Sequence, residues 1–199
     1  MGNTCLGQID AGTYTTQLFS PTLTYTVPAG WGNLEDMAGN FLLLPPGSTL
    51  RGVNPGTSDY LGVYTSVVAA GPCTGQPRPG IAETFDGLVG WLKADPALAL
   101  ANLHDVTVGG LDGVVMDISM KDPKGDGCTD GIWGDVYVGK NPSSLVHAVA
   151  KDYPLRVYLL HNGDRTLAVE LANAIGGSEY PDWFSAATPI VDSFVFGSE

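Results

Sequence analysis

The sequence predicts an α+β fold, with an antiparallel β-sheet of about seven to nine strands flanked by two amphipathic helices. Three observations lead to this prediction. Short β-rich segments separated by turn residues fill most of the chain, two segments show a helical period instead, and the clearest pair of strands carries a hairpin signal. Hairpins imply antiparallel pairing, whereas parallel strands need long crossover connections.

The predicted strands are rich in Thr, Tyr, Val and Leu, and Gly, Pro or Asn follows most of them. The hairpin is predicted in residues 155–174, where two β-rich stretches flank Asn162-Gly163. Residues 142–152 fit either a strand or a short helix. The other predicted strand segments are residues 11–31, 39–47, 59–69, 105–120 (two strands around a glycine turn) and 132–139.

Two segments repeat apolar residues with the period of a helix. In residues 84–96 the repeat begins at Phe85, Thr84 fits the N-cap position, and the helix is expected to end before a proline. Residues 180–196 form a second apolar helical face, in which Pro189 is expected to kink or divide the helix.

The chain of 199 residues has the length of one ordinary domain, and it shows no internal repeat and no long linker. We expect residues 12–199 to form a single α+β domain. Residues 1–11 are expected to be disordered or to derive from the expression vector.

Charge and hydropathy exclude several classes of protein. The chain has 9 Lys and Arg against 21 Asp and Glu, which gives a net charge of −12. Binding to nucleic acid or to anionic lipid requires clustered cations, so we expect neither partner. No apolar run approaches the roughly 18 residues of a membrane span, so we expect no membrane insertion of this domain.

The composition also predicts a location. Charged residues make up only 15% of the chain, against about 25% in an average protein, and Thr, Ser and Gly carry the surface as is common in secreted bacterial proteins. No signal peptide opens the sequence, which by itself favours a cytoplasmic protein. We expect instead an extracellular or cell-surface protein whose signal peptide is absent from this sequence. Cys5 does not fit a lipid-anchor site, because the residues "GNT" directly before it are not apolar.

Two of the three cysteines, Cys73 and Cys128, lie in Gly- and Pro-rich loops. A disulfide between them would stabilise the fold by about 4 kcal/mol in the chain-entropy model. We predict the bond Cys73–Cys128, which leaves Cys5 near the terminus. The alternative is three free thiols in a reducing compartment.

Several phrases together resemble a group of uncharacterised extracellular bacterial domains: residues 11–31, 39–47, 56–67 and the closing run from Val157. The resemblance covers most of the chain. It implies an extracellular location but no activity, because no activity is established for that group. An early strand ending in "VPAGW", the midchain helix and a final hairpin before a helix ending in "IVDSF" also resemble the Mog1/PsbP-like fold weakly. That fold mostly hosts binding and assembly proteins, so what it implies for function is an analogy.

The loop 121–131, "KDPKGDGCTDG", is the most acidic short segment that we considered as a metal site. Its Asp122, Asp126 and Asp130 lie four residues apart, which does not fit the alternate spacing of a calcium loop. We therefore expect a disulfide-held surface turn, with calcium bound through backbone carbonyls as the alternative. No cofactor is expected.

The sequence offers no catalytic motif. His104, His147 and His161 are scattered and lack the spacing of a zinc site, and no "GxSxG" nucleophile motif occurs. Ser58 beside Asp59 leaves a serine triad open, because a triad forms in space and cannot be read from neighbouring residues. Glu35 and Asp36 are adjacent on an extended chain, so their side chains are expected on opposite faces rather than as a carboxylate pair.

Aromatic residues near Gly-rich loops are the remaining candidates for a site. Trp31, Trp133 and Tyr137 are predicted as ligand-binding residues, because exposed rings there would form a platform for a protein or carbohydrate ligand. The predicted function is a secreted or cell-surface binding or assembly module without catalytic activity. The alternatives are a secreted hydrolase with an unrecognised catalytic set and a purely structural domain of the cell envelope.

Overall fold

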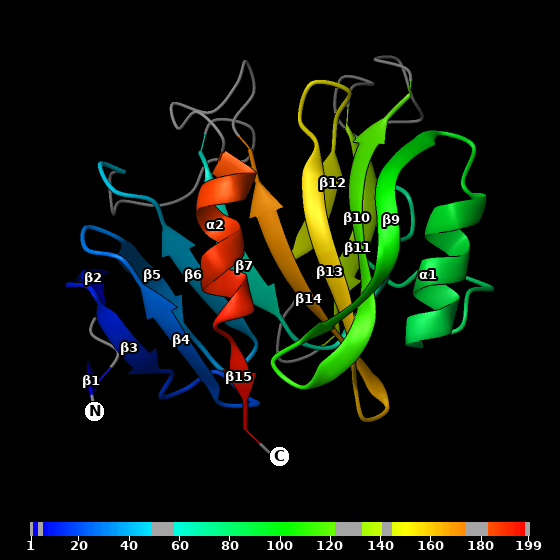
Figure 1. The fold of residues 1–199 in the computed structure, drawn as a ribbon. Helices are drawn as coiled ribbons and strands as arrows, with labels where there is room; N and C mark the ends of the chain where they lie inside the picture. The colour runs from blue at the N-terminus through cyan, green and yellow to red at the C-terminus, as the bar shows by residue number, and fades with distance from the viewer. Residues whose placement is uncertain are drawn as a thin grey trace.

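The structure of this chain is a computed structural model, and it describes residues 2–3, 6–48, 58–121, 133–140, 145–173 and 183–197. Within them the fold is α+β and mostly β, with three β-sheets and two helices (Figure 1).

The largest sheet has eight strands, and each neighbouring pair in it is antiparallel. In order across the sheet, the strands are β2 (Gly7–Gln8), β5 (Gly32–Asp36), β6 (Asn40–Leu44), β7 (Tyr60–Tyr64), β14 (Arg165–Ala172), β13 (Leu155–Asn162), β10 (Leu111–Met120) and β9 (Leu98–Val108). The prediction of a large antiparallel sheet is confirmed.

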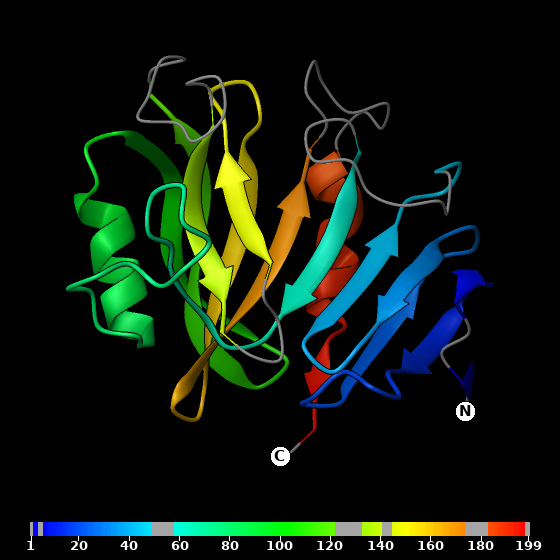
Figure 2. The same ribbon diagram turned by 180° about the vertical axis from the view of Figure 1, so that it is seen from behind.

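The remaining strands form two smaller sheets, which the prediction of a single sheet did not include. The four-stranded sheet is β1 (Gly2–Asn3), β3 (Gly12–Thr15), β4 (Leu23–Val27) and β15 (Val195–Phe196). The three-stranded sheet is β12 (Val146–Val149), β11 (Gly134–Gly139) and β8 (Val67–Ala69). Seen from behind in Figure 2, β11 and β12 lie in front of the large sheet, on the side away from the C-terminal helix.

One predicted strand, residues 59–69, is in fact two strands that belong to different sheets, β7 and β8. Ser66 lies between them with a positive φ of 58°, a conformation that interrupts an extended chain. Residues 142–152, which fitted a strand or a helix, contain the strand β12 in their described part.

Side chains on the two faces of the eight-stranded sheet pack into two separate cores. One core contains the buried residues of helix α1 (Phe85–Ala94) and of the three-stranded sheet, and we call it the α1 core. The other contains the buried residues of helix α2 (Trp183–Asp192) and of the four-stranded sheet, and we call it the α2 core. Alternation along β14 decides the face of each side chain, so that Leu167, Val169 and Leu171 enter the α2 core.

Helix α1 begins and ends close to the predicted positions. The Thr84 hydroxyl caps its N-terminus by accepting a hydrogen bond from the backbone N–H of Gly87 at 3.1 Å. A Cβ atom at position 87 would collide with the backbone carbonyl oxygen of Ala82, which explains a glycine inside the first turns of this helix. The apolar stripe predicted from the sequence is the buried face.

Helix α2 runs from Trp183 to Asp192 and contains Pro189 without being divided by it, contrary to one of the two predicted outcomes. Pro189 is exposed. The apolar residues of the helix lie on the opposite side, with Ala187, Ile190 and Val191 in the α2 core.

The predicted hairpin is confirmed as β13 and β14, with its turn one residue later than the Asn-Gly pair. Asn162 pairs with Arg165, so the two loop residues are Gly163 and Asp164. Gly163 has a φ of 62°, which glycine adopts at no steric cost.

Residues 6–11 correct our expectation for the N-terminus. Gly7 and Gln8 form β2 at the edge of the eight-stranded sheet, and Ile9 is buried in the α2 core. This part of the segment 1–11 therefore belongs to the fold, because its pairing with β5 and the burial of Ile9 hold it there.

Candidate functional site

A groove of about 590 Å³ opens beside the C-terminal end of α1, larger than two other hollows of about 490 and 350 Å³. We call it the α1 groove. Its walls come from the loop before α1, the end of α1, the start of β9, the end of β10 and the start of β11. The lining residues are Pro72, Arg78, Trp91, Ala94, Asp95, Pro96, Ala97, Leu98, Met120, Gly134 and Asp135. Its volume is that of a small-molecule site.

Arg78 is a charged residue of the groove wall with an unusual set of contacts. Its guanidinium lies over the Trp91 ring, 4.9 Å from the ring centroid, a cation–π arrangement. One of its Nη atoms donates to the carbonyl oxygen of Ala70 at 3.3 Å. No carboxylate of the described residues forms an ion pair with Arg78.

The two carboxylates of the groove are both engaged with backbone N–H groups. Asp95 ends α1, and its Oδ1 accepts from the N–H of Ala97 at 2.9 Å. Asp135 accepts from the N–H of Cys73 at 3.1 Å. At the rim, Lys121 donates to the carbonyl oxygen of Pro96 at 3.0 Å. In its described lining, the groove thus combines apolar walls with one guanidinium that has no carboxylate partner and two carboxylates that are hydrogen-bonded.

A second polar feature lies inside the α1 core, between the large sheet and the three-stranded sheet. Glu170 of β14 is 1% exposed and accepts hydrogen bonds from the hydroxyls of Tyr60 and Tyr137. His147 is 6% exposed, and its Nδ1 lies 2.8 Å from the same carboxylate. We call Tyr60, Tyr137, His147 and Glu170 the Glu170 cluster. Since Tyr137 and His147 come from β11 and β12, these bonds join the two sheets.

Aromatic rings enclose the imidazole of His147. Tyr137 stacks on it with ring centroids 4.5 Å apart, and Tyr64 meets it edge-on at 4.2 Å. The Nε2 atom is buried and has no hydrogen-bond partner in the described part of the chain. A histidine paired with a carboxylate is a common catalytic arrangement, but here the pair is closed off within the core.

The electrostatics of the Glu170 cluster follow from its burial and its partners. Burial alone would raise the pKa of Glu170, but His147 and the hydrogen bonds from His147, Tyr137 and Tyr60 outweigh burial and bring that pKa below its ordinary value. Burial, together with the nearby carboxylate, raises the pKa values of Tyr60 and Tyr137 well above the ordinary range. Glu170 is therefore ionised and both tyrosines are neutral donors near neutral pH.

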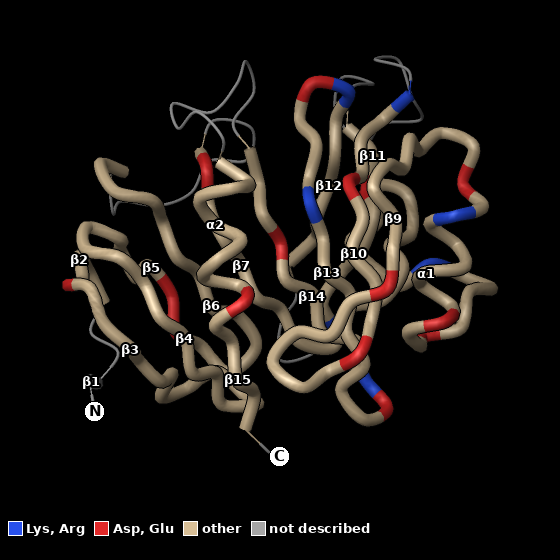
Figure 3. Tube along the Cα trace, viewed as in Figure 1, with Lys and Arg blue, Asp and Glu red and all other residues tan. Residues whose placement is uncertain are grey.

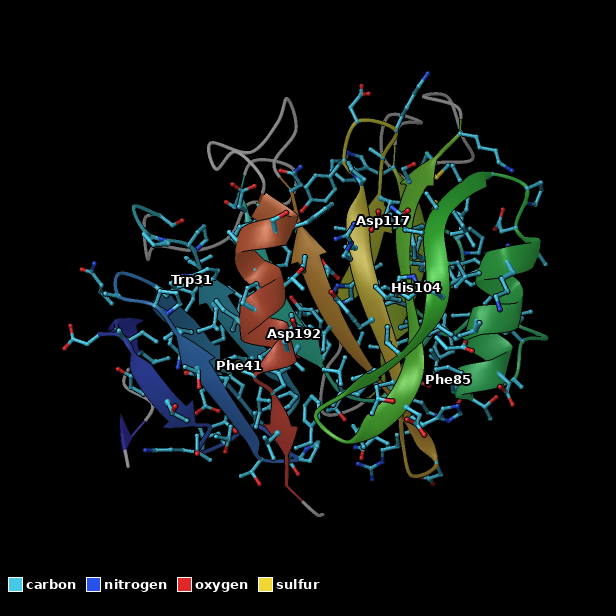
Figure 4. The ribbon with its side chains drawn as sticks, in the orientation of Figure 1. Trp31, Phe41, Phe85, His104, Asp117 and Asp192 are labelled. Atoms are coloured by element: carbon cyan, nitrogen blue, oxygen red, sulfur yellow. The ribbon has the colours of Figure 1, made fainter. Side chains whose placement is uncertain are left out.

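A third charged feature lies on the α2 side of the sheet and is partly exposed. Arg156 donates to Asp117 through Nε at 2.7 Å and Nη2 at 3.0 Å, a bidentate pair. Asn102 donates to the same carboxylate at 2.7 Å. Burial would raise the pKa of Asp117, but these partners bring it below its ordinary value. Figure 4 shows Asp117 and His104 on the β9 side of the molecule.

The three aromatic residues predicted to bind a ligand lie in or against the cores. Trp31 is 3% exposed and stacks on Trp183 of α2, with ring centroids 5.6 Å apart. Figure 4 labels Trp31 beside α2. Tyr137 is 0% exposed because it belongs to the Glu170 cluster. Trp133 is half-buried against Tyr153. The structure does not bring these three rings together as an exposed platform.

The other candidate residues are also separated. His104 is exposed, with its Nδ1 2.7 Å from the carbonyl oxygen of Asn102. His161 is exposed at the end of β13, as expected, and lies against the Phe85 ring at 3.7 Å. The hollow of about 490 Å³ is lined by Phe85, Asp105, Val106, Thr107, Asp112, Gly113, Val114 and His161.

The adjacent Glu35 and Asp36 have different surroundings. Asp36 is buried and accepts hydrogen bonds from three backbone N–H groups, those of residues 17–19. Burial raises the pKa of Glu35. Asp59 is buried, next to Ser58, and neither lines any of the three hollows described above.

The loop that suggested calcium or a disulfide lies outside the described residues for the most part. Asp122, Asp126, Asp130 and Cys128 are among the residues that the structure does not describe. Cys73 is disulfide-bonded, and its pairing with Cys128 remains a prediction. Among the described residues, no three His, Cys, Asp or Glu side chains gather closely enough to hold a metal ion.

Sequence reasoning missed both Arg78 and Glu170. A single carboxylate within the apolar run "TLAVELA" was a signal for Glu170, because a buried charge needs partners. Its partners come from three other strands and cannot be read from the run itself. Arg78 stands between two prolines in "QPRPG", and no local pattern indicated that it lies over Trp91.

No protein-family model matches the chain, and no curated protein sequence matches it. Within the described residues, neither helix is long and apolar enough to cross a membrane.

Among solved structures, the chain is similar to a protein of Bacteroides thetaiotaomicron VPI-5482 known from a crystal structure, with 11% sequence identity and a TM-score of 0.43. That alignment covers 89% of this chain and 46% of the other, so this chain spans less than half the length of that protein. It is also similar to cyanobacterial PsbP (CyanoP) from Synechocystis sp. PCC 6803, with 12% identity, a TM-score of 0.39 and 98% of each chain covered. A PsbP protein is thus among the similar structures, in agreement with the weak resemblance seen in the sequence. Neither likeness implies an activity or a ligand.

Proposed function

We propose that this chain is a secreted or cell-surface binding module without catalytic activity, and that its ligand binds in the α1 groove. The groove itself carries this proposal: a hollow of about 590 Å³ with Trp91, Leu98 and Met120 in its walls. Ligand sites are typically concave and mostly apolar, with a few polar groups that orient the ligand. Among the described residues, the lining of this groove includes no histidine, serine or cysteine.

An extracellular location is part of the same proposal. Charged residues make up only 15% of the sequence, and Cys73 is disulfide-bonded. Disulfides persist in oxidising compartments and are rare in the cytosol. We propose Cys128 as the partner of Cys73, so that denatured protein shows one free thiol; three free thiols would refute the pairing.

The experiment that tests binding is an NMR screen of a fragment library against the labelled protein. The Trp91 indole N–H and the Met120 methyl group report on the groove, and the Trp183 indole reports on the distant α2 core. We expect fragments that bind to shift the two groove signals and to leave Trp183 unchanged.

Two substitutions provide the matched control. Ala94→Phe places a large ring in the groove wall, whereas Ala101→Phe adds the same ring at an exposed position of β9 away from the groove. Binding should be lost in the first variant and kept in the second. If no fragment shifts the groove signals, or if Ala94→Phe binds as well as the wild type, the groove is not the binding site.

One observation favours a hydrolase as the second candidate. The hollow of about 490 Å³ is lined by His161 together with Asp105 and Asp112, residue types that serve as general acid and base. No ion pair joins His161 to either carboxylate in the described part of the chain. Turnover of chromogenic ester or glycoside substrates that disappears in His161→Gln would establish the hydrolase and refute the non-catalytic module. A purely structural role predicts self-association at low micromolar concentration and no bound fragment.

A further inference from the structure

Arg78 is half-buried in the wall of the α1 groove and has no carboxylate partner among the described residues. Within that part of the chain it donates hydrogen bonds only to backbone carbonyl oxygens, from its backbone N–H to Ala69 at 2.8 Å and from Nη1 to Ala70 at 3.3 Å. Its guanidinium Cζ lies over the Trp91 ring, 4.9 Å from the ring centroid. In the part of the chain that the structure describes, no carboxylate forms an ion pair with this guanidinium.

Arg156 is the useful comparison, because it combines an aromatic contact with a carboxylate partner. Its guanidinium lies over the Phe184 ring at 4.5 Å, as that of Arg78 lies over Trp91, but it also binds Asp117 through two parallel hydrogen bonds. Arg78 has the same aromatic support, but none of the described residues supplies it with a carboxylate. The planar fork of a guanidinium matches a carboxylate in shape and charge, so Arg78 is suited to bind a carboxylate ligand.

Two further cations lie near the groove, although the whole chain carries a net charge of −12. Lys93 lies in the last turn of α1, and Lys121 donates to Pro96 at the groove rim. Figure 3 shows Lys and Arg positions together with acidic positions on and beside α1.

Asp95 and Asp135 limit the charge of the ligand. Both line the groove, and their backbone hydrogen bonds hold them there. A second negative charge on the ligand would meet these carboxylates, and like charges at close range repel. The groove is thus suited to a single negative charge, placed at Arg78.

The rest of the lining is apolar. Trp91, Leu98 and Met120 belong to the edge of the α1 core, and prolines complete the walls. A ligand with an apolar or aromatic body would bury its surface against these side chains, which contributes about 25 cal/mol per Å² of apolar area removed from water.

We propose that the α1 groove binds a small apolar monocarboxylate, with the carboxylate on the Arg78 guanidinium and the apolar body against Trp91, Leu98 and Met120. This inference rests on the proposed function, because it names the ligand class of the same groove. It commits to a free small molecule, since the groove has the volume of a small-molecule site.

The test compares three probes of one shape: 4-phenylbutanoate, its neutral amide and the cationic 4-phenylbutylamine. Their dissociation constants are measured by NMR titration of the Trp91 indole signal at constant ionic strength. We expect the acid to bind at least about tenfold more tightly than the amide, as hydrogen bonds to charged groups require. The amine should bind more weakly than the acid. Phenylsuccinate, a dianion, should bind more weakly than the acid as well.

Arg78→Gln should reduce the affinity for 4-phenylbutanoate at least about tenfold and leave that for the amide unchanged. Lys93→Gln removes a nearby charge outside the groove lining and should change the affinity for the acid by less than about twofold, since exposed charges act weakly through solvent. Equal binding of acid and amide, or a wild-type affinity in Arg78→Gln, would overturn the carboxylate proposal while leaving a binding groove intact. If the library and all probes fail to shift the Trp91 signal, both proposals fall. A dipeptide whose free C-terminus binds far better than 4-phenylbutanoate would overturn the small-molecule part.

Discussion

The Glu170 cluster and the α1 groove lie on the same side of the eight-stranded sheet, and strand β11 contributes to both. They differ in whether their charged group has partners. In the cluster, both carboxylate oxygens of Glu170 have partners, and water is excluded. In the groove, the Arg78 guanidinium faces an open hollow without an ion-pair partner among the described residues.

The difference has a physical reason. An ion deep in the protein loses several kcal/mol of hydration and persists only with partners, so the charge of Glu170 serves the fold. A guanidinium at the wall of an open groove keeps part of its hydration, and leaving it without a carboxylate costs little. The first arrangement is suited to holding two sheets together and the second to receiving a ligand.

The largest expected effect comes from removing the charge of the cluster. Glu170→Gln leaves His147 without its carboxylate and should lower the free energy of unfolding by about 3 to 5 kcal/mol, as for other broken buried pairs. Urea denaturation followed by tryptophan fluorescence measures the loss.

Two controls sharpen this measurement. Asp117→Asn breaks the partly exposed pair with Arg156 and should cost about 1 kcal/mol or less. Tyr60→Phe removes one hydrogen bond to Glu170 and should fall between the two, at about 1.5 to 3 kcal/mol. A loss in Glu170→Gln no larger than that in Asp117→Asn would show that burial does not distinguish the two ion pairs.

A smaller, pH-dependent effect should follow from the lowered pKa of Glu170. Its folded-state pKa lies below its ordinary value of 4.5, so the unfolded chain takes up the proton first as the pH falls. The stabilisation is fully present above pH 4.5 and is lost as the pH falls through the folded-state pKa. The loss amounts to about 1.4 kcal/mol for each pH unit of the shift.

Asp117 also has a lowered pKa, so the wild type must be compared with Glu170→Gln over the same pH range. The stability difference between the two should shrink as the pH falls below 4.5. A difference that does not change with acid would mean that Glu170 titrates alike in the folded and unfolded chains.

The smallest effect on stability is expected in the groove. Arg78→Gln removes a guanidinium that lies over the Trp91 ring and has no ion pair within the described residues. The change in the free energy of unfolding should be about 1 kcal/mol or less, the size of an exposed cation–π contact. Thermal unfolding in the absence of ligand measures it. A loss similar to that of Glu170→Gln would assign Arg78 to the fold and remove the contrast between the two regions.

Local patterns predicted much of the fold. The helical repeat from Phe85 and the cap at Thr84 located α1, because both signals lie within a few residues of each other. The Asn162-Gly163 pair located the β13–β14 hairpin to within one residue. The division of residues 59–69 into β7 and β8 was not predicted. Nothing in "DYLGVYTSVVA" shows that the chain leaves one sheet for another at Ser66.

The candidate sites were less predictable. Trp31 and Tyr137 stood near glycines, which suggested exposed rings, but each packs against partners that are distant in sequence, Trp183 and His147. Arg78 and Trp91 are 13 positions apart (91 − 78) on a loop and a helix, and their contact depends on how that loop returns to α1.

The sequence by itself determined what depends on neighbours along the chain: antiparallel hairpins, the ends of α1 and the net charge of −12. Only the tertiary structure decided which polar groups are paired. Tyr60, Tyr137 and His147 reach Glu170 from three different strands, so the cluster exists only after the two sheets have packed. In the same packing, no carboxylate of the described residues pairs with Arg78 in the groove wall. Pairing is a property of distance in space, and the sequence specifies that distance only through the complete fold.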